Sequence, residues 1–268
     1  MTTPRNFQVN LRGVIDLLSD HLYSGPQVYL RELLQNAVDA VTARQHSQPE
    51  HRGSIRFEVF PASAKSPATL VVTDDGVGLS EDEVHEFLAT IGQSSKRDPL
   101  HRDDFIGQFG IGLLSAFVVC EEIVVITRSV RNGARTVEWK GCADGTYSVR
   151  LLEHDFEPGT QVFLRAKSGT AEYFEPEFVQ RTARHYGCHL PVPIQVQPGE
   201  DRTLINEDPP WRCEYTGREI ARDRWLDYGR RVFDMDFLDA IPLESRVGGV
   251  EGVAFVLPFE ASLSQRRT

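Results

Sequence analysis

The stretch RELLQNAVDAV, from Arg31 to Val41, carries polar side chains at a spacing that a helix turns onto one face. Glu32, Asn36 and Asp39 stand at positions i, i+4 and i+7, so a helix projects all three from one side within two turns. A buried carboxylate or amide needs a partner such as a metal ion, water or a ligand. A solvated surface stripe is the alternative. The remaining helix is apolar around much of its circumference and is expected to be largely buried, through Leu30, Leu33, Leu34, Ala37, Val38 and Val41.

The composition is that of a soluble globular protein, with 268 residues, of which 40% are hydrophobic and 25% charged. The formal net charge of −10 argues against partners such as nucleic acid or a membrane surface. The longest nearly apolar run, Ile111–Cys120, falls short of the roughly 20 residues that a membrane span needs. The four cysteines form no CxxC pair and indicate neither a zinc site nor a disulfide framework, so a cytoplasmic location is expected.

The order of periodic segments predicts an α+β two-layer fold. Helical periodicity over 6–23 and 25–45 precedes a hairpin of Ser54–Phe60 and Ala68–Asp74, and an apolar helix follows the glycine-rich segment near residue 110. We expect a mixed, mostly antiparallel sheet with helices on one face. The later strands are expected at Ile123–Arg128, Arg135–Trp139, Tyr147–Leu152, Thr160–Arg165 and 191–196, with a helix near Glu175–Tyr186.

A change of composition near Gln197–Trp211, which is rich in proline and acidic residues, predicts a linker. Residues 1–200 are therefore expected to form one domain. Residues 201–268 are too few for a typical independent domain, and we expect a linker followed by the incomplete start of a second domain.

An apolar strand runs into an Asp-Gly turn in VVTDDGVGLS, residues 71–80. An ordinary turn requires one glycine, whereas Gly76 and Gly78 at alternate positions indicate close approach of the backbone to something bulky. At the buried end of a strand, Asp74 is suited to accept a hydrogen bond from an amino group such as that of adenine. A plain strand-ending turn is the alternative.

The segment GQFGIG, Gly107–Gly112, precedes an apolar helix. Glycines at a helix N-terminus expose N–H groups that bind phosphate, although a flexible loop fits the same letters. The segment is neither a dinucleotide-binding G-x-G-x-x-G motif nor a P-loop. Downstream, Gly159 and Thr160 open a strand, where the Thr160 hydroxyl could share a water with Asp74.

Taken in order, these motifs resemble the ATP-binding domain of the GHKL superfamily, which comprises Hsp90 chaperones, type II topoisomerases, sensor histidine kinases and MutL mismatch-repair proteins. Within it the chain is most similar to the Hsp90/HtpG family, over roughly residues 6–196. The resemblance implies the Bergerat fold, an α+β sandwich. It is carried by LYSGPQVYLRELLQNAVDA, LATIGQSSK and IGQFGIGLLSAFVV, while INEDPPW and GVAFVLPF are similar to the entry to the Hsp90 middle domain.

The resemblance implies an ATPase that binds ATP or ADP with Mg²⁺. Glu32 would be the general base that activates water, Asn36 would hold Mg²⁺ through its amide oxygen, and Asp39 would line the site through water. Asp74 would accept from the adenine amine, with Thr160 sharing a bridging water. Residues 80–104 would close as a lid. The other implied nucleotide contacts are Gly78, Leu79, Ser94, Gly107, Gln108, Phe109, Gly110, Ile111, Gly112 and Leu113.

Three positions depart from the family pattern. Leu113 stands where a phenylalanine is usual, Gln93 where the lid often has a basic residue, and Phe87 where an asparagine commonly contacts nucleotide. These changes spare the implied catalytic positions but are expected to alter affinity and lid dynamics.

The function implied by the resemblance is that of an ATP-dependent chaperone, with unfolded client proteins and a homodimer in the full-length protein. Hsp90 ATPases complete their site with a middle-domain arginine that normally lies beyond the end of this chain, so weak hydrolysis is expected here. A histidine-kinase catalytic domain is one alternative, although no histidine stands in a dimerising helical segment. A non-catalytic nucleotide-gated module is another, against which Glu32 argues.

Overall fold

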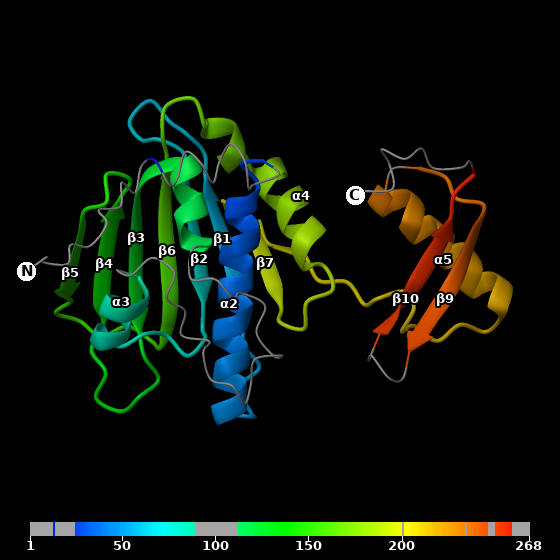
Figure 1. Ribbon diagram of the computed structural model, residues 1–268, viewed down its shortest axis with the longest axis horizontal. Helices are drawn as coiled ribbons and strands as arrows, with labels where there is room; N and C mark the ends of the chain where they lie inside the picture. The colour runs from blue at the N-terminus through cyan, green and yellow to red at the C-terminus, as the bar shows by residue number, and fades with distance from the viewer. Residues whose placement is uncertain are drawn as a thin grey trace, which may run out of the picture. The chain divides into compact units, whose positions relative to one another are not determined.

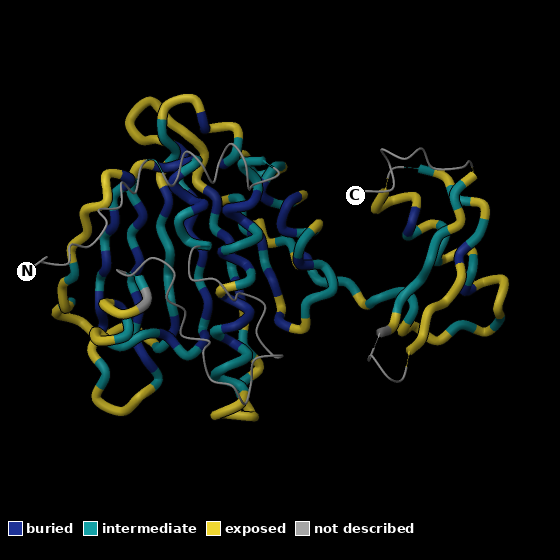
Figure 2. The backbone as a smooth tube through the Cα atoms, in the orientation of Figure 1, coloured by how far each residue is buried: buried dark blue, intermediate teal, exposed yellow. Residues whose placement is uncertain are grey.

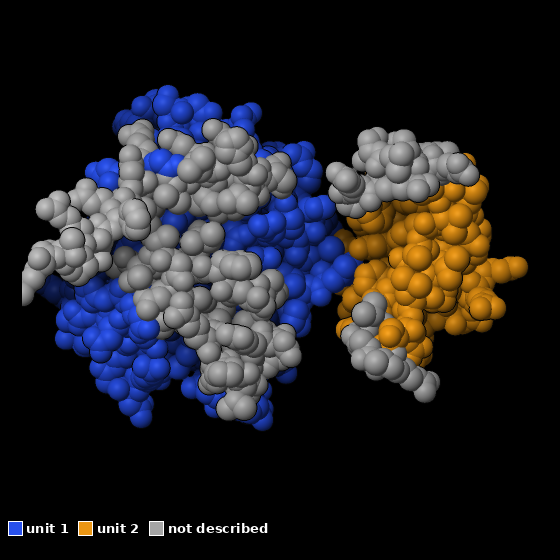
Figure 3. Space-filling view, viewed as in Figure 1, with its two compact units in different colours: residues 1–206 blue, residues 207–268 orange. Residues whose placement is uncertain are grey.

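The computed structural model describes residue 13 and residues 25–88, 112–199, 201–233, 235–245 and 250–258, except the side chains of Phe87 and Val250. The chain divides into two compact units, residues 1–206 and 207–268 (Figure 3). The division lies six residues beyond the boundary expected after residue 200, and the assignment of the second unit as an incomplete domain stays a prediction.

The first unit is built on an eight-stranded sheet with the order β5-β4-β3-β6-β2-β1-β7-β8 (Figure 1). Strands β1 and β7 pair in parallel, and all other neighbours are antiparallel, so the sheet is mixed as expected. The strands are β1 Ile55–Phe60, β2 Thr69–Asp74, β3 Cys120–Arg128, β4 Val137–Cys142, β5 Tyr147–Leu151, β6 Gly159–Ala166, β7 Ile194–Pro198 and β8 Thr203–Leu204.

Helix α2, Val28–Ser47, crosses the sheet in front of β1 and β2 (Figure 1). It also packs against α4, Pro176–Gly187, and against the 3₁₀ helix η3, Gly112–Val118. Its Tyr29 hydroxyl donates to the Tyr173 carbonyl over 2.6 Å, which fixes α2 to the short 3₁₀ helix η4, Ala171–Phe174. All six apolar residues expected to bury α2 are buried.

The core lies between this helical layer and the sheet (Figure 2). In β1, Ile55, Phe57 and Val59 are buried, whereas the alternate residues Arg56 and Glu58 are only partly buried. This alternation shows which sheet face the helices cover. Residues directly opposite one another on antiparallel strands share a face, so the register of β1 extends this buried face across the neighbouring strands.

The expected α+β sandwich is confirmed. Some of the predicted helices and strands agree with the structure and others differ from it. The hairpin of β1 and β2 and the later strands lie within a few residues of their expected bounds. The apolar helix expected after the glycine-rich segment is a tighter 3₁₀ helix over its described part. The polar stretch from residue 80 carries the short helix α3, Glu81–Phe87, and the helix expected at 6–23 lies outside the described residues apart from Gly13.

The second unit contains helix α5, Arg218–Phe233, and an antiparallel hairpin of β9, Asp239–Ser245, and β10, Val250–Val256. The rings of Phe233, Phe237 and Phe255 pack together between them. Helix α5 was not expected from the sequence: only Ala221 and Gly229 of its residues are buried, so its apolar signal is weak. Among the described residues of the chain, no helix is both long and apolar enough to span a membrane.

Candidate nucleotide-binding site

Three polar residues lie side by side on the helix-covered face of the sheet, at one end of β2, β6 and β3. Asp74 is directly opposite Thr160, and Thr160 is directly opposite Thr127. The next residues on this face are Val72, Val162 and Val125, so the polar row borders an apolar one. The sequence predicted the first two members of this row, and the sheet order brings them together.

The Asp74 carboxylate is buried, with 8% of the residue exposed. Its Oδ1 accepts a hydrogen bond from the Gly76 N–H over 2.9 Å. Burial raises the pKa of Asp74 to about 7, an effect that the neighbouring charge of Asp75 reinforces and that main-chain hydrogen bonds from Gly76 and Thr160 oppose. A buried carboxylate with unused acceptor capacity suits a ligand that brings hydrogen-bond donors.

Thr127 completes the row, and sequence reasoning missed it. The residue is 1% exposed. Its Oγ1 accepts from the Leu79 N–H over 2.9 Å and lies 3.0 Å from the Gly159 carbonyl and 3.1 Å from Thr160 Oγ1. A threonine in a β-branched strand is unremarkable by itself, and the only signal was the alternation that turns it toward the helices. Recognising it requires the non-local pairing of β3 with β6.

The two glycines of the Asp-Gly turn pack against the protein's own backbone. Gly78 has φ +59°, and a Cβ there would overlap with the Arg128 carbonyl; a Cβ at Gly76 would overlap with Ala40 of α2. The Val77 N–H also donates to the Ala40 carbonyl over 2.9 Å. The close approach inferred from the sequence is therefore real, and at both positions the protein's own backbone is a close neighbour.

The three polar residues of α2 differ in exposure. Asp39 is buried, Glu32 is partly buried and Asn36 is exposed. The Asn36 amide is therefore not buried, although Asn36 shares a helix face with the buried Asp39 and the partly buried Glu32. An exposed amide oxygen remains available to a ligand.

The Glu32 carboxylate has two different neighbours. Its Oε1 accepts from Arg31 Nη2 over 2.7 Å, and 17% of its side chain is exposed. A Cβ at Gly112 would overlap with Oε2, so this oxygen faces the first residue of η3. The carboxylate of α2 and the end of the glycine-rich segment are thus in contact, as a phosphate site with an adjacent base requires.

Part of the expected nucleotide contacts lies outside the described residues, namely Ser94, Gly107, Gln108, Phe109, Gly110 and Ile111, together with Gln93 and the lid beyond Leu88. Of the glycine-rich segment the structure describes Gly112, and the following Leu113 is partly buried against the core. At the other end of the expected lid, Ser80 caps α3 in a reciprocal capping box with Glu83, and Glu83 pairs with Arg131 over 2.9 Å.

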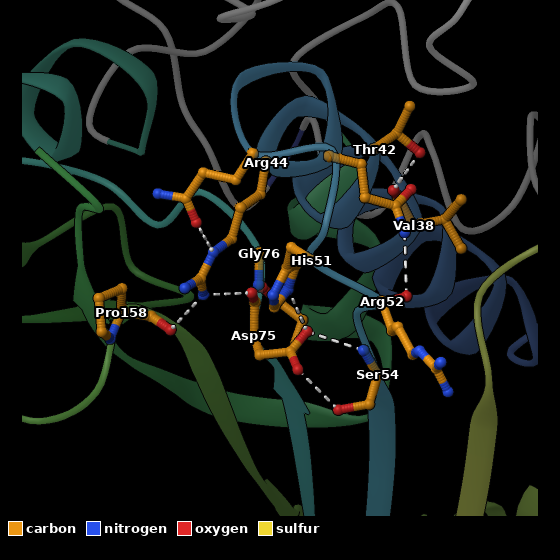
Figure 4. Close-up of polar contacts among 12 residues, drawn as sticks. Val38, Thr42, Arg44, His51, Arg52, Ser54, Asp75, Gly76 and Pro158 are labelled. Atoms are coloured by element: carbon orange, nitrogen blue, oxygen red, sulfur yellow. Dashed lines mark hydrogen bonds and ion pairs between the residues drawn. The ribbon is translucent and has the colours of Figure 1, made fainter.

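Next to Asp74 in the chain, a network holds the Asp-Gly turn to the end of α2 (Figure 4). Arg44 Nη1 donates to the main-chain carbonyls of Asp75, over 2.7 Å, and Pro158, over 3.4 Å. The Asp75 carboxylate accepts from the Ser54 N–H over 2.7 Å and lies 3.2 Å from His51 Nε2. Asp75 is adjacent to Asp74, and Pro158 lies two residues before Thr160. Arg44 therefore links the two segments that carry Asp74 and Thr160.

The residues present fit Mg²⁺ and an adenine nucleotide. Asp74 offers a buried acceptor to an amino group, and the exposed Asn36 amide offers an oxygen ligand of the kind that Mg²⁺ prefers. The described residues hold no group of three or more His, Cys, Asp or Glu side chains able to bind a metal alone.

Comparison with known proteins points to the same chemistry. The model of the family described as histidine kinase-, DNA gyrase B- and HSP90-like ATPase matches residues 23–170, more than half of the chain. The chaperone protein HtpG of Yersinia pestis is 34% identical over 218 residues, covering 76% of this chain and 35% of the relative. HtpG of Pectobacterium atrosepticum is 31% identical over 206 residues, which are 72% of this chain and 33% of the relative.

The chain therefore spans about a third of the length of the curated relatives it matches. The matched region contains α2, the Asp-Gly turn, η3 and the polar row, which are the parts of the structure that form the candidate site. The chain belongs to the histidine kinase-, DNA gyrase B- and HSP90-like ATPase family, and its similarity within that family is to HtpG.

Proposed function

We propose that this chain binds ATP with Mg²⁺ between the polar row of the sheet and helix α2, and hydrolyses it as part of an Hsp90-type chaperone. The observation that carries the proposal is the buried Asp74 carboxylate beside Thr160, on the sheet face that α2 covers. In this arrangement Asp74 accepts from the adenine amino group and Thr160 shares a bridging water with it. Gly78 and Leu79 lie against the base.

Helix α2 supplies the hydrolytic groups in this proposal. Glu32 acts as the general base that orients and deprotonates the attacking water, a role that typically contributes ~10²–10⁴-fold to the rate. Asn36 holds Mg²⁺, whose charge offsets that of the phosphates, and Asp39 lines the site through water. The contact of Glu32 with Gly112 supports this role because it sets the base beside the glycine-rich segment.

The glycine-rich segment supplies phosphate contacts through N–H groups of Gly107 to Gly112, with Ser94 from the lid and Leu113 beside the base. Residues 80–104 close over bound ATP. Within the proposed lid, Ser80 and Glu83 form a capping box, and Glu83 pairs with Arg131 of the β3–β4 connection, which gives the lid a fixed start.

For the whole protein we propose an ATP-dependent chaperone cycle in the cytoplasm, with transient homodimer closure and unfolded proteins as clients. The printed name of the relatives, chaperone protein HtpG, supports this proposal. If the site needs an arginine from another domain, the present chain alone should hydrolyse ATP only weakly.

The role of Glu32 is tested with Glu32→Ala in the full-length protein. The variant should retain Mg²⁺-dependent ATP binding in calorimetric titration and lose at least 100-fold in steady-state phosphate release. Glu58→Ala, at a partly buried position on the opposite face of the sheet, is the matched control and should leave both unchanged. Undiminished phosphate release by Glu32→Ala would remove Glu32 from the mechanism.

A further inference from the structure

The hydroxyl of Thr127 sets the hydrogen-bonding character of Thr160. A threonine oxygen has one proton to donate and two lone pairs that accept. Around Thr127 Oγ1 stand the Leu79 N–H, which can only donate, the Gly159 carbonyl, which can only accept, and the Thr160 hydroxyl, which can do either. Because the Leu79 N–H can only donate and the Gly159 carbonyl can only accept, they determine whether the Thr160 hydroxyl donates or accepts.

The three contacts are satisfied together in one way. Thr127 accepts a hydrogen bond from the Leu79 N–H and donates its only proton to the Gly159 carbonyl. Its second lone pair then accepts a hydrogen bond from the Thr160 hydroxyl. Thr127 is 1% exposed, so an unmade bond here would be costly. The Thr160 proton is therefore used inside the sheet, and Thr160 keeps only lone pairs for a ligand.

We propose that Thr127 is a specificity-determining positioning residue, which makes Thr160 an acceptor beside the Asp74 carboxylate and so selects a base that carries a 6-amino group. This inference rests on the proposed function. Asp74 and Thr160 are direct cross-strand neighbours and together form an edge of acceptors. A purine with a 6-oxo group puts an acceptor where adenine puts its amino donor, and this mismatch at the 6-position disfavours it although its N1–H can still donate.

Thr127 also fixes the backbone beside the base. Its bond to the Leu79 N–H holds the residue that follows Gly78, whose close approach to the Arg128 carbonyl already limits movement of the turn. Loss of the Thr127 hydroxyl would leave the Leu79 N–H without this acceptor and free the Thr160 proton to rotate. A freed proton can be donated to a 6-oxo group, so discrimination should fall.

The experiment compares ADP with inosine diphosphate, which differs in having a 6-oxo group and an N1–H. Calorimetric titration of the wild-type chain with both nucleotides in the presence of Mg²⁺ gives the dissociation constant for inosine diphosphate divided by that for ADP, the preference ratio. Thr127→Val, which keeps the shape and removes the hydroxyl, should narrow this ratio about tenfold. Thr127→Ser restores a hydroxyl at the same position and should restore the ratio.

The matched control is Thr170→Val. Thr170 is also buried, and its hydroxyl lies 2.7 Å from the Val119 carbonyl and 3.0 Å from the Lys167 carbonyl, at the opposite end of β3 and β6. This variant should lose thermal stability and keep the wild-type preference ratio, because its lost bonds lie away from the polar row. A ratio that narrows equally in Thr127→Val and Thr170→Val would show a general structural effect and overturn the inference.

Thr160→Val tests the same idea if Thr127→Val does not fold. It removes the acceptor itself and should also narrow the ratio. An unchanged ratio in Thr127→Val, or in Thr160→Val, overturns the role of this hydroxyl pair while ADP binding by the wild type upholds the proposed function. A wild-type chain that binds neither nucleotide overturns both.

Discussion

At the scale of single residues, Asp74 shows how a binding role opposes stability. The carboxylate is buried, and desolvation raises its pKa from 3.8 to about 7. Without a ligand, ionising this group in the folded chain is unfavourable, and a ligand that donates hydrogen bonds to it removes part of the penalty. The site is thus poised for a donor-bearing ligand at the expense of the nucleotide-free fold.

The pH dependence of stability follows from the direction of this shift. The folded state holds the Asp74 proton more tightly than the unfolded state, so this group's contribution to stability falls as pH rises from about 4 through about 7 and then levels off. A rise in the pKa from 3.8 to about 7 corresponds to a change in stability of roughly 4 kcal/mol at most. Asp74→Asn should abolish this part of the slope and make the nucleotide-free chain more stable at pH 8, as measured by urea unfolding across pH 5–8. A variant less stable than wild type at pH 8 would contradict the assignment.

A second residue-scale prediction concerns Gly78. Alanine there must adopt φ +59° and would also overlap with the Arg128 carbonyl, so Gly78→Ala should destabilise the chain by roughly 2–4 kcal/mol. Gly133, at φ +77° with no atom near its ideal Cβ, is the control that isolates the steric part. Gly133→Ala should cost only about 1 kcal/mol in denaturant unfolding. Equal losses would mean that the backbone conformation alone matters at Gly78.

At the scale of elements, the site depends on how α2 is joined to the ends of β2 and β6. The Val77 N–H bonds to the Ala40 carbonyl, and Arg44 bonds to the carbonyls of Asp75 and Pro158. These contacts connect the helix that carries Glu32 with the strands that carry Asp74 and Thr160. The relative placement of base-binding and hydrolytic groups is therefore set by hydrogen bonds to main chain as well as by the core.

Arg44→Met tests this coupling because methionine keeps much of the apolar stem and removes the guanidinium donors. We expect ADP affinity to fall about tenfold and unfolding free energy to fall by roughly 1–2 kcal/mol. Arg52→Met is the control, since the side chain of Gln45 bonds to the main-chain carbonyl of Arg52 and leaves its exposed side chain replaceable. Calorimetric titration and urea unfolding measure both effects. Unchanged ADP affinity in Arg44→Met would show that the core alone places the strands.

The local chemistry was largely predictable from sequence where it depends on one element. The apolar periodicity around Leu33 and Leu34 predicted a buried α2, and the alternation before Asp74 predicted a strand end. Thr127 and Arg44 were missed because their roles depend on residues distant in sequence. Thr127 contacts Gly159, 32 residues away, and Arg44 contacts Asp75, 31 residues away. No pattern within their own segments marks either residue, and only the sheet order places them at the site.

At the scale of the whole molecule, the first unit extends into the segment whose change in composition predicted a linker. Ile205 is fully buried, and its N–H donates to the Ile194 carbonyl. The Asn206 side chain accepts from the Ile194 N–H and donates to the carbonyls of Leu190 and Val192. Composition marks the proline-rich, acidic segment, but it does not show that these two residues complete the edge of the sheet at β7.

Chain length tests this boundary. A chain of residues 1–200 lacks Ile205 and Asn206 and should be less stable than a chain of residues 1–206 by roughly 3 kcal/mol or more, through lost apolar burial and main-chain groups left without partners. Both chains contain every residue of the polar row, so the longer one should bind ADP as the full chain does. Equal thermal stability of the two would place the boundary at residue 200.

The central claim is that Asp74 binds the adenine of a Mg²⁺-nucleotide, and calorimetric titration of the whole chain with Mg²⁺-ADP at pH 8 tests it most directly. Thermal melts of the protein samples establish that Asp74→Asn is folded before titration. The account predicts saturable one-to-one binding by the wild type and at least 100-fold weaker binding by Asp74→Asn, because the amide brings donors to an edge that must accept. Absence of binding by the wild type, or equal affinity in the folded variant, would contradict it.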